Sequence, residues 1–293
     1  PLDAELKITD DNRIKQFLPT IRHIIECGGK SILMSHLGNP VGVKDPKCSL
    51  KPVAERLSTL LGIPIELASD CIGPEVENKV AALQPGAVLL LENLRFHKGE
   101  TENDSTFSSS LARLGDVYVN DAFATAHRAH ASMVGVANLF KEKCAGLLMQ
   151  KELDYAERAL KNPKHPLCVI LGGLKTSTKL NALLNIASKA DKIIIGGAMA
   201  NTFLAAQGIQ TGKSLVEREL FPQVTKLLAD LARRDCKLYL PVDVMVGPSL
   251  GAKGVARAVP AVEIPPDSMA LDIGPATCLL YKAAIQNAET IIW

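Results

Sequence analysis

The chain has few aromatic residues, little net charge and no long apolar run. Aromatic residues make up 4% of its 293 residues, with a single Trp, so few side chains can stack on nucleic-acid bases. A formal net charge of +2 at pH 7 argues against a nucleic-acid-binding protein that neutralises phosphates. The apolar runs have the length of strands and end in Gly, Asn or Asp, which argues against a membrane-spanning helix.

The seven cysteines lack any pair at the spacing of metal ligands. They stand at positions 27, 48, 71, 144, 168, 236 and 278. We predict reduced, mostly structural thiols in a reducing compartment, which favours the cytoplasm. The sequence opens at Pro1 without an initiator Met and closes on the strand-like "AETIIW". We therefore expect further sequence at both ends, which leaves an organelle open as the alternative location.

Short aliphatic runs alternate with segments that carry apolar residues at helical spacing. The expected strands are residues 31–34, 65–68, 87–91, 117–119, 167–171, 192–195, 237–240, 269–272 and 290–293. Strand and helix in repetition predict an α/β fold of doubly wound parallel sheets with helices on both faces. The long helix-forming stretch 146–166 interrupts this pattern. We therefore expect two lobes, 1–149 and 150–293, joined by a long helix and facing a central cleft.

The segments that follow the strands differ between the two halves, and ligands of open α/β sheets bind at such strand ends. In the first half they supply cationic side chains, which suit a small, multiply charged acid. These side chains are His36, Arg95, His127, Arg128 and His130. For His127 and His130, ordering of the loop is the favoured reading.

In the second half the same positions supply glycines and two lysines, in "GGLKTSTK", "GGAMAN", "PVDV" and "DIGPAT". Lys175 and Lys179 lie four residues apart, and we expect them on one face of the first turns of a helix. Cations are unfavourable at that end of a helix unless an anion binds, so the pattern predicts a phosphate site. Asp243 and Asp272 also follow strands, where metal ligation and turn hydrogen bonds remain equally open.

Two common phosphate-binding motifs are absent. The stretch "GIQTGKS" at 208–214 is one residue shorter than a P-loop and follows a helical pattern instead of a strand. No Gly-x-Gly-x-x-Gly opens a helix, so a dinucleotide-dependent dehydrogenase has little support.

Taken together, the segments at the strand ends resemble phosphoglycerate kinase. The matching stretches run in the family's order over essentially the whole chain: "ITDDNRI", "SHLGNP", "SLKPVAERLS", "LLLENLRF", "VNDAFATAHRAHAS", "LMQKEL", "LGGLKTSTK", "IGGAMANTFL", "GKSLVE", "LPVDV" and "LDIGPAT". The resemblance implies two lobes, a monomer, small-molecule substrates, and no nucleic-acid or membrane partner. It implies the glycolytic reaction in which 1,3-bisphosphoglycerate and ADP give 3-phosphoglycerate and ATP, with Mg²⁺.

The resemblance also implies roles for particular positions. The catalytic positions are Arg13, Lys175 and Lys179, and the 3-phosphoglycerate positions are Arg13, His36, Asn39, Arg95 and Arg128. The nucleotide positions are Gly172, Gly173, Lys179, Gly197, Ala198, Leu215 and Leu271. Mg²⁺ is expected to arrive with the nucleotide and to have its protein ligand outside this chain, so no residue here is assigned to the metal.

The reaction that the resemblance implies needs no general base, because the attacking carboxylate is already ionised at neutral pH. Three positions depart from the family's usual pattern. Asn39 stands in place of Arg, Thr178 in place of Asp, and Ala124 in place of Gly. These departures, and the expected missing ends, leave an alternative open: a catalytically weakened relative or an inactive fragment that binds nucleotide.

Overall fold

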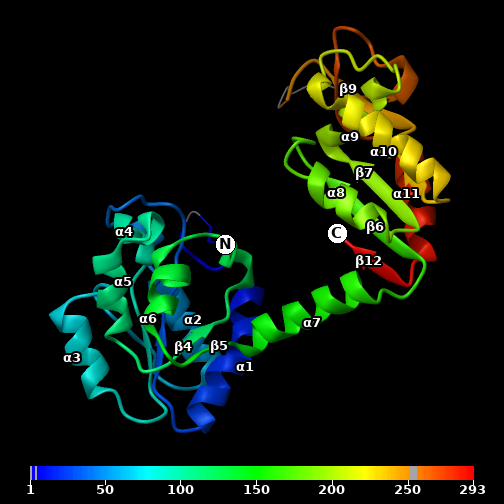
Figure 1. Ribbon diagram of the computed structural model, residues 1–293. Coiled ribbons are helices and arrows are strands. Elements are labelled where there is room, and N and C mark those ends of the chain that lie inside the picture. The colour runs from blue at the N-terminus through cyan, green and yellow to red at the C-terminus, as the bar shows by residue number, and fades with distance from the viewer. Residues whose placement is uncertain (1, 4, 251–255) are drawn as a thin grey trace. The chain divides into compact units, whose positions relative to one another are not determined.

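The computed structural model describes residues 2, 3, 5–250 and 256–293. The chain divides into two compact units, residues 1–154 and residues 155–293, and each is described by itself. The chain passes from unit 1 to unit 2 within helix α7, Leu147–Lys161 (Figure 1). The boundary expected between residues 149 and 150 falls within the same helix.

Unit 1 alternates strands and helices. Its strands are β1 (Ser31–Leu33), β2 (Glu66–Leu67), β3 (Val88–Leu90), β4 (Tyr118–Asn120) and β5 (Lys143–Ala145). Its helices are α1 (Asn12–Glu26), α2 (Lys51–Leu61), α3 (Pro74–Ala82), α4 (Lys98–Glu102), α5 (Ser105–Ala112) and α6 (Val136–Leu139). β3 lies between β1 and β2 in a parallel sheet, and β4 pairs in parallel with β5.

The central strand β3 explains why helices cover both faces of that sheet. Val88 and Leu90 point to one face and pack with residues of α1 and α2. Leu89 and the following Leu91 point to the other face and pack with residues of α3, α5 and α6. Successive side chains of a strand alternate between faces, so a continuous apolar strand must be covered on both.

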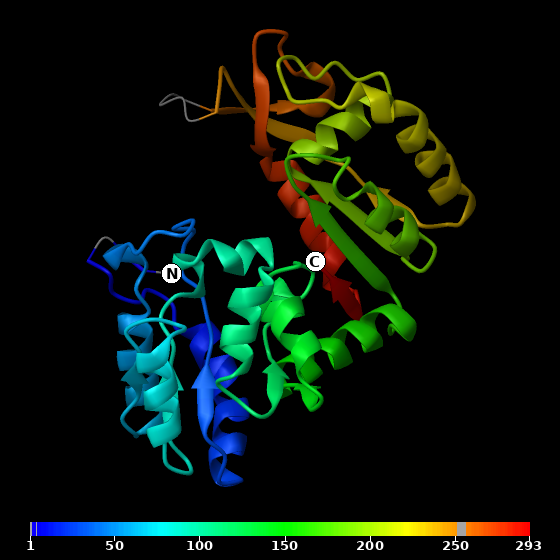
Figure 2. The same ribbon diagram turned by 60° about the vertical axis from the view of Figure 1, so that its left-hand side comes forward.

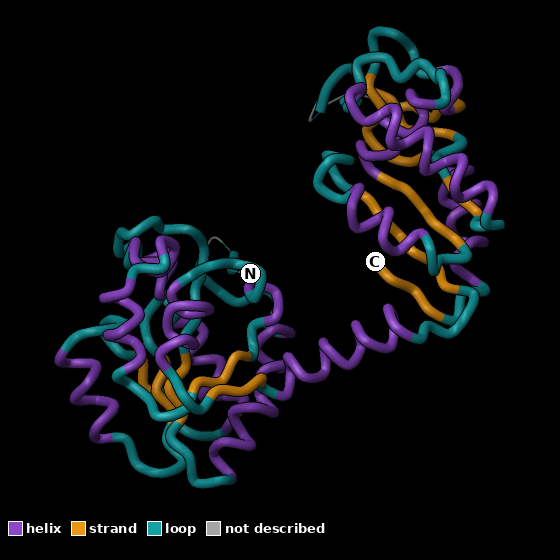
Figure 3. The backbone as a smooth tube through the Cα atoms, in the orientation of Figure 1, coloured by secondary structure: helices purple, strands orange, loops and turns teal. Residues whose placement is uncertain are grey.

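Unit 2 holds a 4-stranded parallel sheet with the strand order β12-β6-β7-β8, one strand more than the parallel sheet of unit 1 (Figure 3). Its strands are β6 (Leu167–Gly172), β7 (Lys192–Gly196), β8 (Lys237–Tyr239), β9 (Asp243–Gly247), β10 (Arg257–Pro260), β11 (Met269–Ile273) and β12 (Thr290–Ile292). Its helices are α8 (Leu180–Ala187), α9 (Gly197–Ala206), α10 (Phe221–Arg233) and α11 (Pro275–Gln286).

This sheet also buries both faces. Val169, Ile193 and Ile195 pack with residues of α8, α9 and α10 on one face. Cys168 and Ile194 pack with α11 on the other, and Figure 2 shows α11 in red against the sheet. The predicted α/β class with doubly wound parallel sheets is confirmed.

All nine expected strands are present, and each of their ends is unchanged or shifted by one residue. Three strands were not expected, namely β5, β9 and β10. The expectation of parallel sheets throughout was wrong for one sheet, because β9 pairs antiparallel with both β10 and β11. Residues 248–256 join β9 to β10, and a connection of fewer than about a dozen residues favours antiparallel pairing over a helical crossover.

Within the described part of the chain, no helix is both long and apolar enough to cross a membrane.

Two adjacent leucines of α8 test the core of unit 2. Leu183 is 0% exposed and Leu184 is 43% exposed. Leu183→Ala should lower the free energy of unfolding of unit 2 by about 2–5 kcal/mol, because it leaves a cavity between α8 and the sheet. Leu184→Ala should change it by about 0.5 kcal/mol or less. Urea denaturation followed by circular dichroism measures both, and equal losses would contradict the packing described.

Candidate functional site

Five basic side chains, three arginines and two histidines, come from the segments that follow strands of unit 1 or open its first helix. We call them the basic cluster: Arg13, His36, Arg95, Arg128 and His130. Arg13 lies in the first turn of α1, and His36 follows β1. Arg95 lies in a short 3-10 helix, η2 (Leu94–Phe96), after β3, and the other two follow β4. The ends of β1, β3 and β4, which belong to two sheets, and the start of α1 thus supply residues that are far apart in sequence.

Electrostatics show that these groups are close to one another. Removal of water around His36 lowers its pKa most, and the charges of Arg95, Arg128, His130 and Arg13 lower it further, to about 4. The ring is therefore neutral at pH 7, although it lies at an exposed position. An anion among these side chains would relieve the repulsion between them.

Arg95 is the most constrained member of the basic cluster. Its side chain is buried at 9% exposure, and one terminal nitrogen donates to the carbonyl of Gly38 at 2.8 Å. Its Nε has no hydrogen-bond partner. Among the described residues, no carboxylate lies within ion-pair distance of Arg13, Arg95 or Arg128. A buried, unpaired guanidinium is costly, so this arrangement is suited to an anionic ligand.

Buried polar side chains that the sequence analysis missed hold the loops of the basic cluster. The amide of Asn93 donates to the carbonyls of Leu37 at 2.7 Å and Cys48 at 2.8 Å, and its oxygen accepts from the amide of Arg95 at 3.0 Å. Asn93 therefore links the loop of His36 to η2. The stretch "LENLRF" contains this residue, but its role depends on partners about 45 to 56 positions away.

Glu100 orders the segment that carries Arg128. Its buried carboxylate accepts from the amide of Ser132 at 3.0 Å and from the hydroxyl of Ser132 at 2.6 Å. The same carboxylate lies 3.7 Å from Nδ1 of His130. His130 therefore contacts the residue that orders the loop, whereas His127 is exposed. Asn39 is also exposed, in the loop that follows Gly38.

In unit 2 the ends of β6 and β7 form a glycine-lined surface. Gly172 pairs with Gly196 across the two strands. Gly197 has φ +64°, and a Cβ there would lie 3.0 Å from the backbone nitrogen of Gly173. Any larger residue would clash with that backbone, so the surface remains bare. The first turn of α9, which contains Ala198, starts from this surface.

The expected placement of Lys175 in a helix was wrong. α8 begins at Leu180 with Lys179 as its N-cap, and Lys175 lies in the loop before it. Glu217 explains the difference, because its carboxylate accepts hydrogen bonds from the amides of Thr176 and Ser177 and from the hydroxyl of Ser177 at 2.5 Å. These bonds replace the helical pattern that the local sequence favours.

Lys179 lies at the glycine-lined surface, and Lys175 is exposed in the loop that follows Gly173. The side chain of Lys179 packs on Gly173, where a Cβ would lie 2.9 Å from its Cε. Neither lysine forms an ion pair with any carboxylate that the structure describes. Lysine ammonium groups beside a helix N-terminus and bare backbone are suited to bind phosphate groups.

Two further predicted nucleotide positions, Leu215 and Leu271, lie on segments that touch each other. The hydroxyl of Ser214 accepts from the amide of Ala270 at 2.9 Å, which fixes the segment before α10 against β11. Leu215 is exposed and Leu271 is half-buried, so both offer apolar surface. Asp243 is not free to bind a metal, since its carboxylate accepts from the amides of Ala276 and Thr277 and caps α11.

A hollow of about 840 Å³ in unit 1 does not coincide with these residues. It is lined by residues 5–11 together with residues of α2 and contains no member of the basic cluster. The candidate ligand-binding surfaces are therefore the strand ends themselves.

Comparison with known proteins gives one consistent result. A family model described as phosphoglycerate kinase matches residues 1–293. A curated phosphoglycerate kinase of Desulfotalea psychrophila is 51% identical over 293 residues, which is 100% of this chain and 75% of the relative. A cytosolic phosphoglycerate kinase of Triticum aestivum is 49% identical over 100% of this chain and 73% of the relative.

Solved structures agree. The phosphoglycerate kinase of Coxiella burnetii superposes with a TM-score of 0.77 at 40% identity, covering 100% of this chain and 74% of that one. The phosphoglycerate kinase of Pyrococcus horikoshii OT3 superposes with a TM-score of 0.82 at 30% identity, covering 99% of this chain and 74% of that one.

The pKa of His36 tests the electrostatics of the basic cluster. The chain has six histidines, so their rings can be followed separately by NMR during a pH titration. His36 should titrate near 4 in the free protein, and Arg128→Ala should raise its pKa towards 6.5, because one neighbouring positive charge is lost. Arg113→Ala, which removes an exposed arginine paired with Glu77, should leave it unchanged.

The lowered pKa of His36 also determines how this residue changes the stability of the fold with pH. The pKa of His36 is lower in the folded state than in the unfolded chain, so between pH 6.5 and about 4 the unfolded chain binds more protons. His36 therefore contributes a loss of stability as the pH falls through this window. Arg128→Ala should reduce that loss. A His36 midpoint near 6.5 in the unsubstituted protein would contradict the described cluster.

Proposed function

The chain belongs to the phosphoglycerate kinase family, and on that premise we propose a division of its reaction between the two units. It is a glycolytic phosphotransferase that interconverts 1,3-bisphosphoglycerate and ADP with 3-phosphoglycerate and ATP. Unit 1 binds the three-carbon acid at the basic cluster, and unit 2 binds the nucleotide at the glycine-lined surface. The observation that carries the proposal is the set of unpaired cations at the strand ends, above all the buried Arg95 with its unpartnered Nε.

On the acid side, the guanidinium groups of Arg13, Arg95 and Arg128 hold the phosphate and carboxylate of 3-phosphoglycerate by forked hydrogen bonds. His36 is neutral before binding and donates or accepts a single hydrogen bond. When the anion binds, it offsets the repulsion that lowers the pKa of His36, so binding raises that pKa. Asn39 contributes an uncharged amide where the family usually has a cation.

On the nucleotide side, Gly172, Gly173 and Gly197 allow the backbone to approach the ligand closely. Ala198 leaves the first turn of α9 equally open, and the amides of that turn face negative charge favourably. The ammonium of Lys179 binds the phosphates. Leu215 and Leu271 supply apolar contacts for the base and ribose.

The protein accelerates the chemical step by positioning the two substrates and by stabilising the charge on the transferring phosphoryl group. The carboxylate of 3-phosphoglycerate attacks the terminal phosphorus of ATP, the bond from that phosphorus to the bridging oxygen breaks, and ADP leaves with the electron pair. No proton has to be removed from the nucleophile. Lys175 and Arg13 stabilise the charge on the oxygens of the transferring phosphoryl group. Glu217 positions Lys175 by fixing the backbone of Thr176 and Ser177.

Family members use ATP or ADP with Mg²⁺. Bound Mg²⁺ would neutralise phosphate charge. Asp243 does not fit as its ligand, because both carboxylate oxygens already accept hydrogen bonds from α11.

A catalytically weakened relative, the alternative left open by the sequence, is not favoured. The whole chain matches the family, and identity to curated members is about half. We further propose that the enzyme acts as a monomer in the cytoplasm, without nucleic-acid or membrane partners. The cytosolic relative from Triticum aestivum supports that location.

The direct test is a coupled assay of ATP consumption that depends on 3-phosphoglycerate and Mg²⁺. Turnover that requires both substrates supports the proposal. ATP hydrolysis without the acid would contradict it, as would full activity with an unphosphorylated acid in place of 3-phosphoglycerate.

Substitution of Lys175 tests its proposed role in phosphoryl transfer. Lys175→Ala should lower kcat by about 10²- to 10³-fold, because it removes a cation that acts on charge present in the transition state. The KM for both substrates should change by much less. Lys226→Ala, an exposed lysine of α10, is the matched control and should keep full activity. An unchanged kcat in Lys175→Ala would overturn the assigned role.

A further inference from the structure

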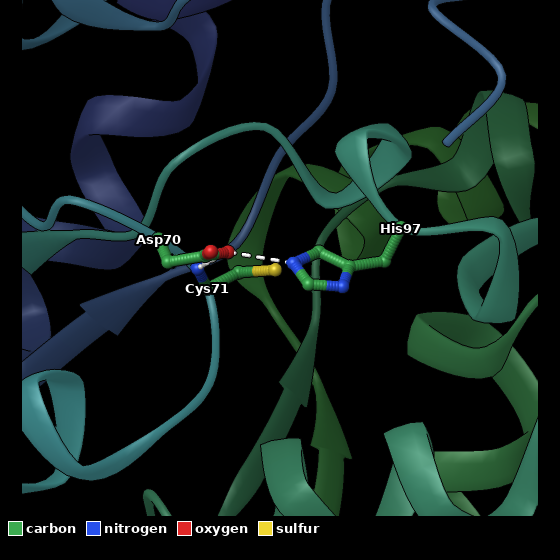
Figure 4. A group of neighbouring side chains, drawn as sticks. All are labelled: Asp70, Cys71 and His97. Carbon is green, nitrogen blue, oxygen red and sulfur yellow. Dashed lines mark hydrogen bonds and ion pairs between the residues drawn. The ribbon is translucent and has the colours of Figure 1, made fainter. Parts of the chain in front are cut away.

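Three side chains with different ligand atoms meet in unit 1, outside the basic cluster. Asp70 and Cys71 follow β2, and His97 follows η2. One atom of each, a carboxylate oxygen, the sulfur and a ring nitrogen, lie within 4.8 Å of one another. Figure 4 shows the three side chains directed toward a common point, with the sulfur of Cys71 beside the ring of His97.

We propose that these three residues form a binding site for a thiophilic divalent cation of the Zn²⁺ type. A thiolate, an imidazole and a carboxylate are the ligand types that Zn²⁺ takes in proteins. Mg²⁺ and Ca²⁺ prefer oxygen ligands alone, so the sulfur and nitrogen select against them. A water molecule completes the fourth position of the tetrahedron.

The geometry requires small movements. Zinc–ligand bonds of about 2.0–2.3 Å place tetrahedral ligand atoms roughly 3.5 Å apart. Oδ1 of Asp70 lies 2.6 Å from Nε2 of His97, so on metal binding this pair opens by about 1 Å while the sulfur moves closer. The ring of His97 stacks on Phe107 with centroids 5.2 Å apart, which keeps its plane in place.

The proposed ligand Asp70 already forms an ion pair with Lys44. The ammonium of Lys44 lies 2.7 Å from Oδ2 of Asp70, and its side chain is 59% exposed. Such an exposed pair is weak, so Lys44 can turn into solvent and free that oxygen. Metal binding replaces the charge of Lys44, forms a bond to the sulfur of Cys71 and releases the thiol proton to solvent.

Cys71 is fully buried. Burial protects its thiol from competing reactions in solvent. A second Cys–His pair exists on α1, where the sulfur of Cys27 lies 3.9 Å from Nε2 of His23. Among the described residues, no third ligand atom joins that pair in a cluster, and the pair serves as the control.

The test is titration of the reduced protein with Zn²⁺ and with Co²⁺ in a buffer that does not bind metals. We expect one equivalent to bind, with a near-ultraviolet band from the Co²⁺–thiolate bond and a raised Tm. Cys71→Ala should remove the band, and His97→Gln should weaken affinity at least about 100-fold, since even outer-shell changes cost 10- to 100-fold. Lys44→Ala should strengthen binding by up to roughly fivefold, because the competing ammonium is gone.

The control variant is Cys27→Ala, which removes the thiol of the α1 pair. It should retain both the band and the affinity. Loss of the band in Cys27→Ala with retention in Cys71→Ala would overturn the assignment. So would equal affinity in the unsubstituted protein and in folded His97→Gln. Folding of each variant is checked by circular dichroism before titration.

Discussion

Uncompensated positive charge at the ends of parallel strands is the constraint on which the rest of the structure depends. In unit 1 burial lowers the pKa of His36 and nearby positive charges lower it further, while Arg95 is buried without a carboxylate partner among the described residues. In unit 2 Lys179 packs on Gly173, and neither Lys179 nor Lys175 pairs with a described carboxylate. Both arrangements cost free energy that a bound anion offsets. The two sheets provide the rigidity that keeps such like charges in place.

The loops that carry these cations are held by buried acceptors and donors. Hydrogen bonds of Asn93 connect the loop of His36 to η2. Hydrogen bonds to Glu100 fix the segment that carries Arg128, and hydrogen bonds to Glu217 connect the loop of Lys175 to residues 211–217. Each of these groups makes two or more hydrogen bonds with backbone or hydroxyl groups. The binding residues thus lie on loops, while a second layer of polar side chains gives the loops fixed positions.

Local patterns in the sequence predict strands and helices, because these elements depend mainly on residues close together along the chain. The strands around Val169 and Ile194 were predicted because continuous apolar runs between polar turns are typical of buried strands. Long-range contacts were not predictable in this way. The loop of Lys175 depends on Glu217, about 40 positions away, and the Asp70–Cys71–His97 group needs β2 and β3 to pair. The antiparallel sheet depends on short connections, which a search for alternating strands and helices overlooks.

The division of labour between the units is tested most directly by calorimetric titration of each ligand alone. Arg128→Ala should weaken binding of 3-phosphoglycerate by roughly 10- to 100-fold and leave binding of ATP unchanged, since a charge-assisted hydrogen bond is lost on one side only. Lys179→Ala should weaken ATP binding and leave the acid unaffected. If either substitution weakened both ligands equally, the two ligands would not occupy separate units, and the account would be wrong.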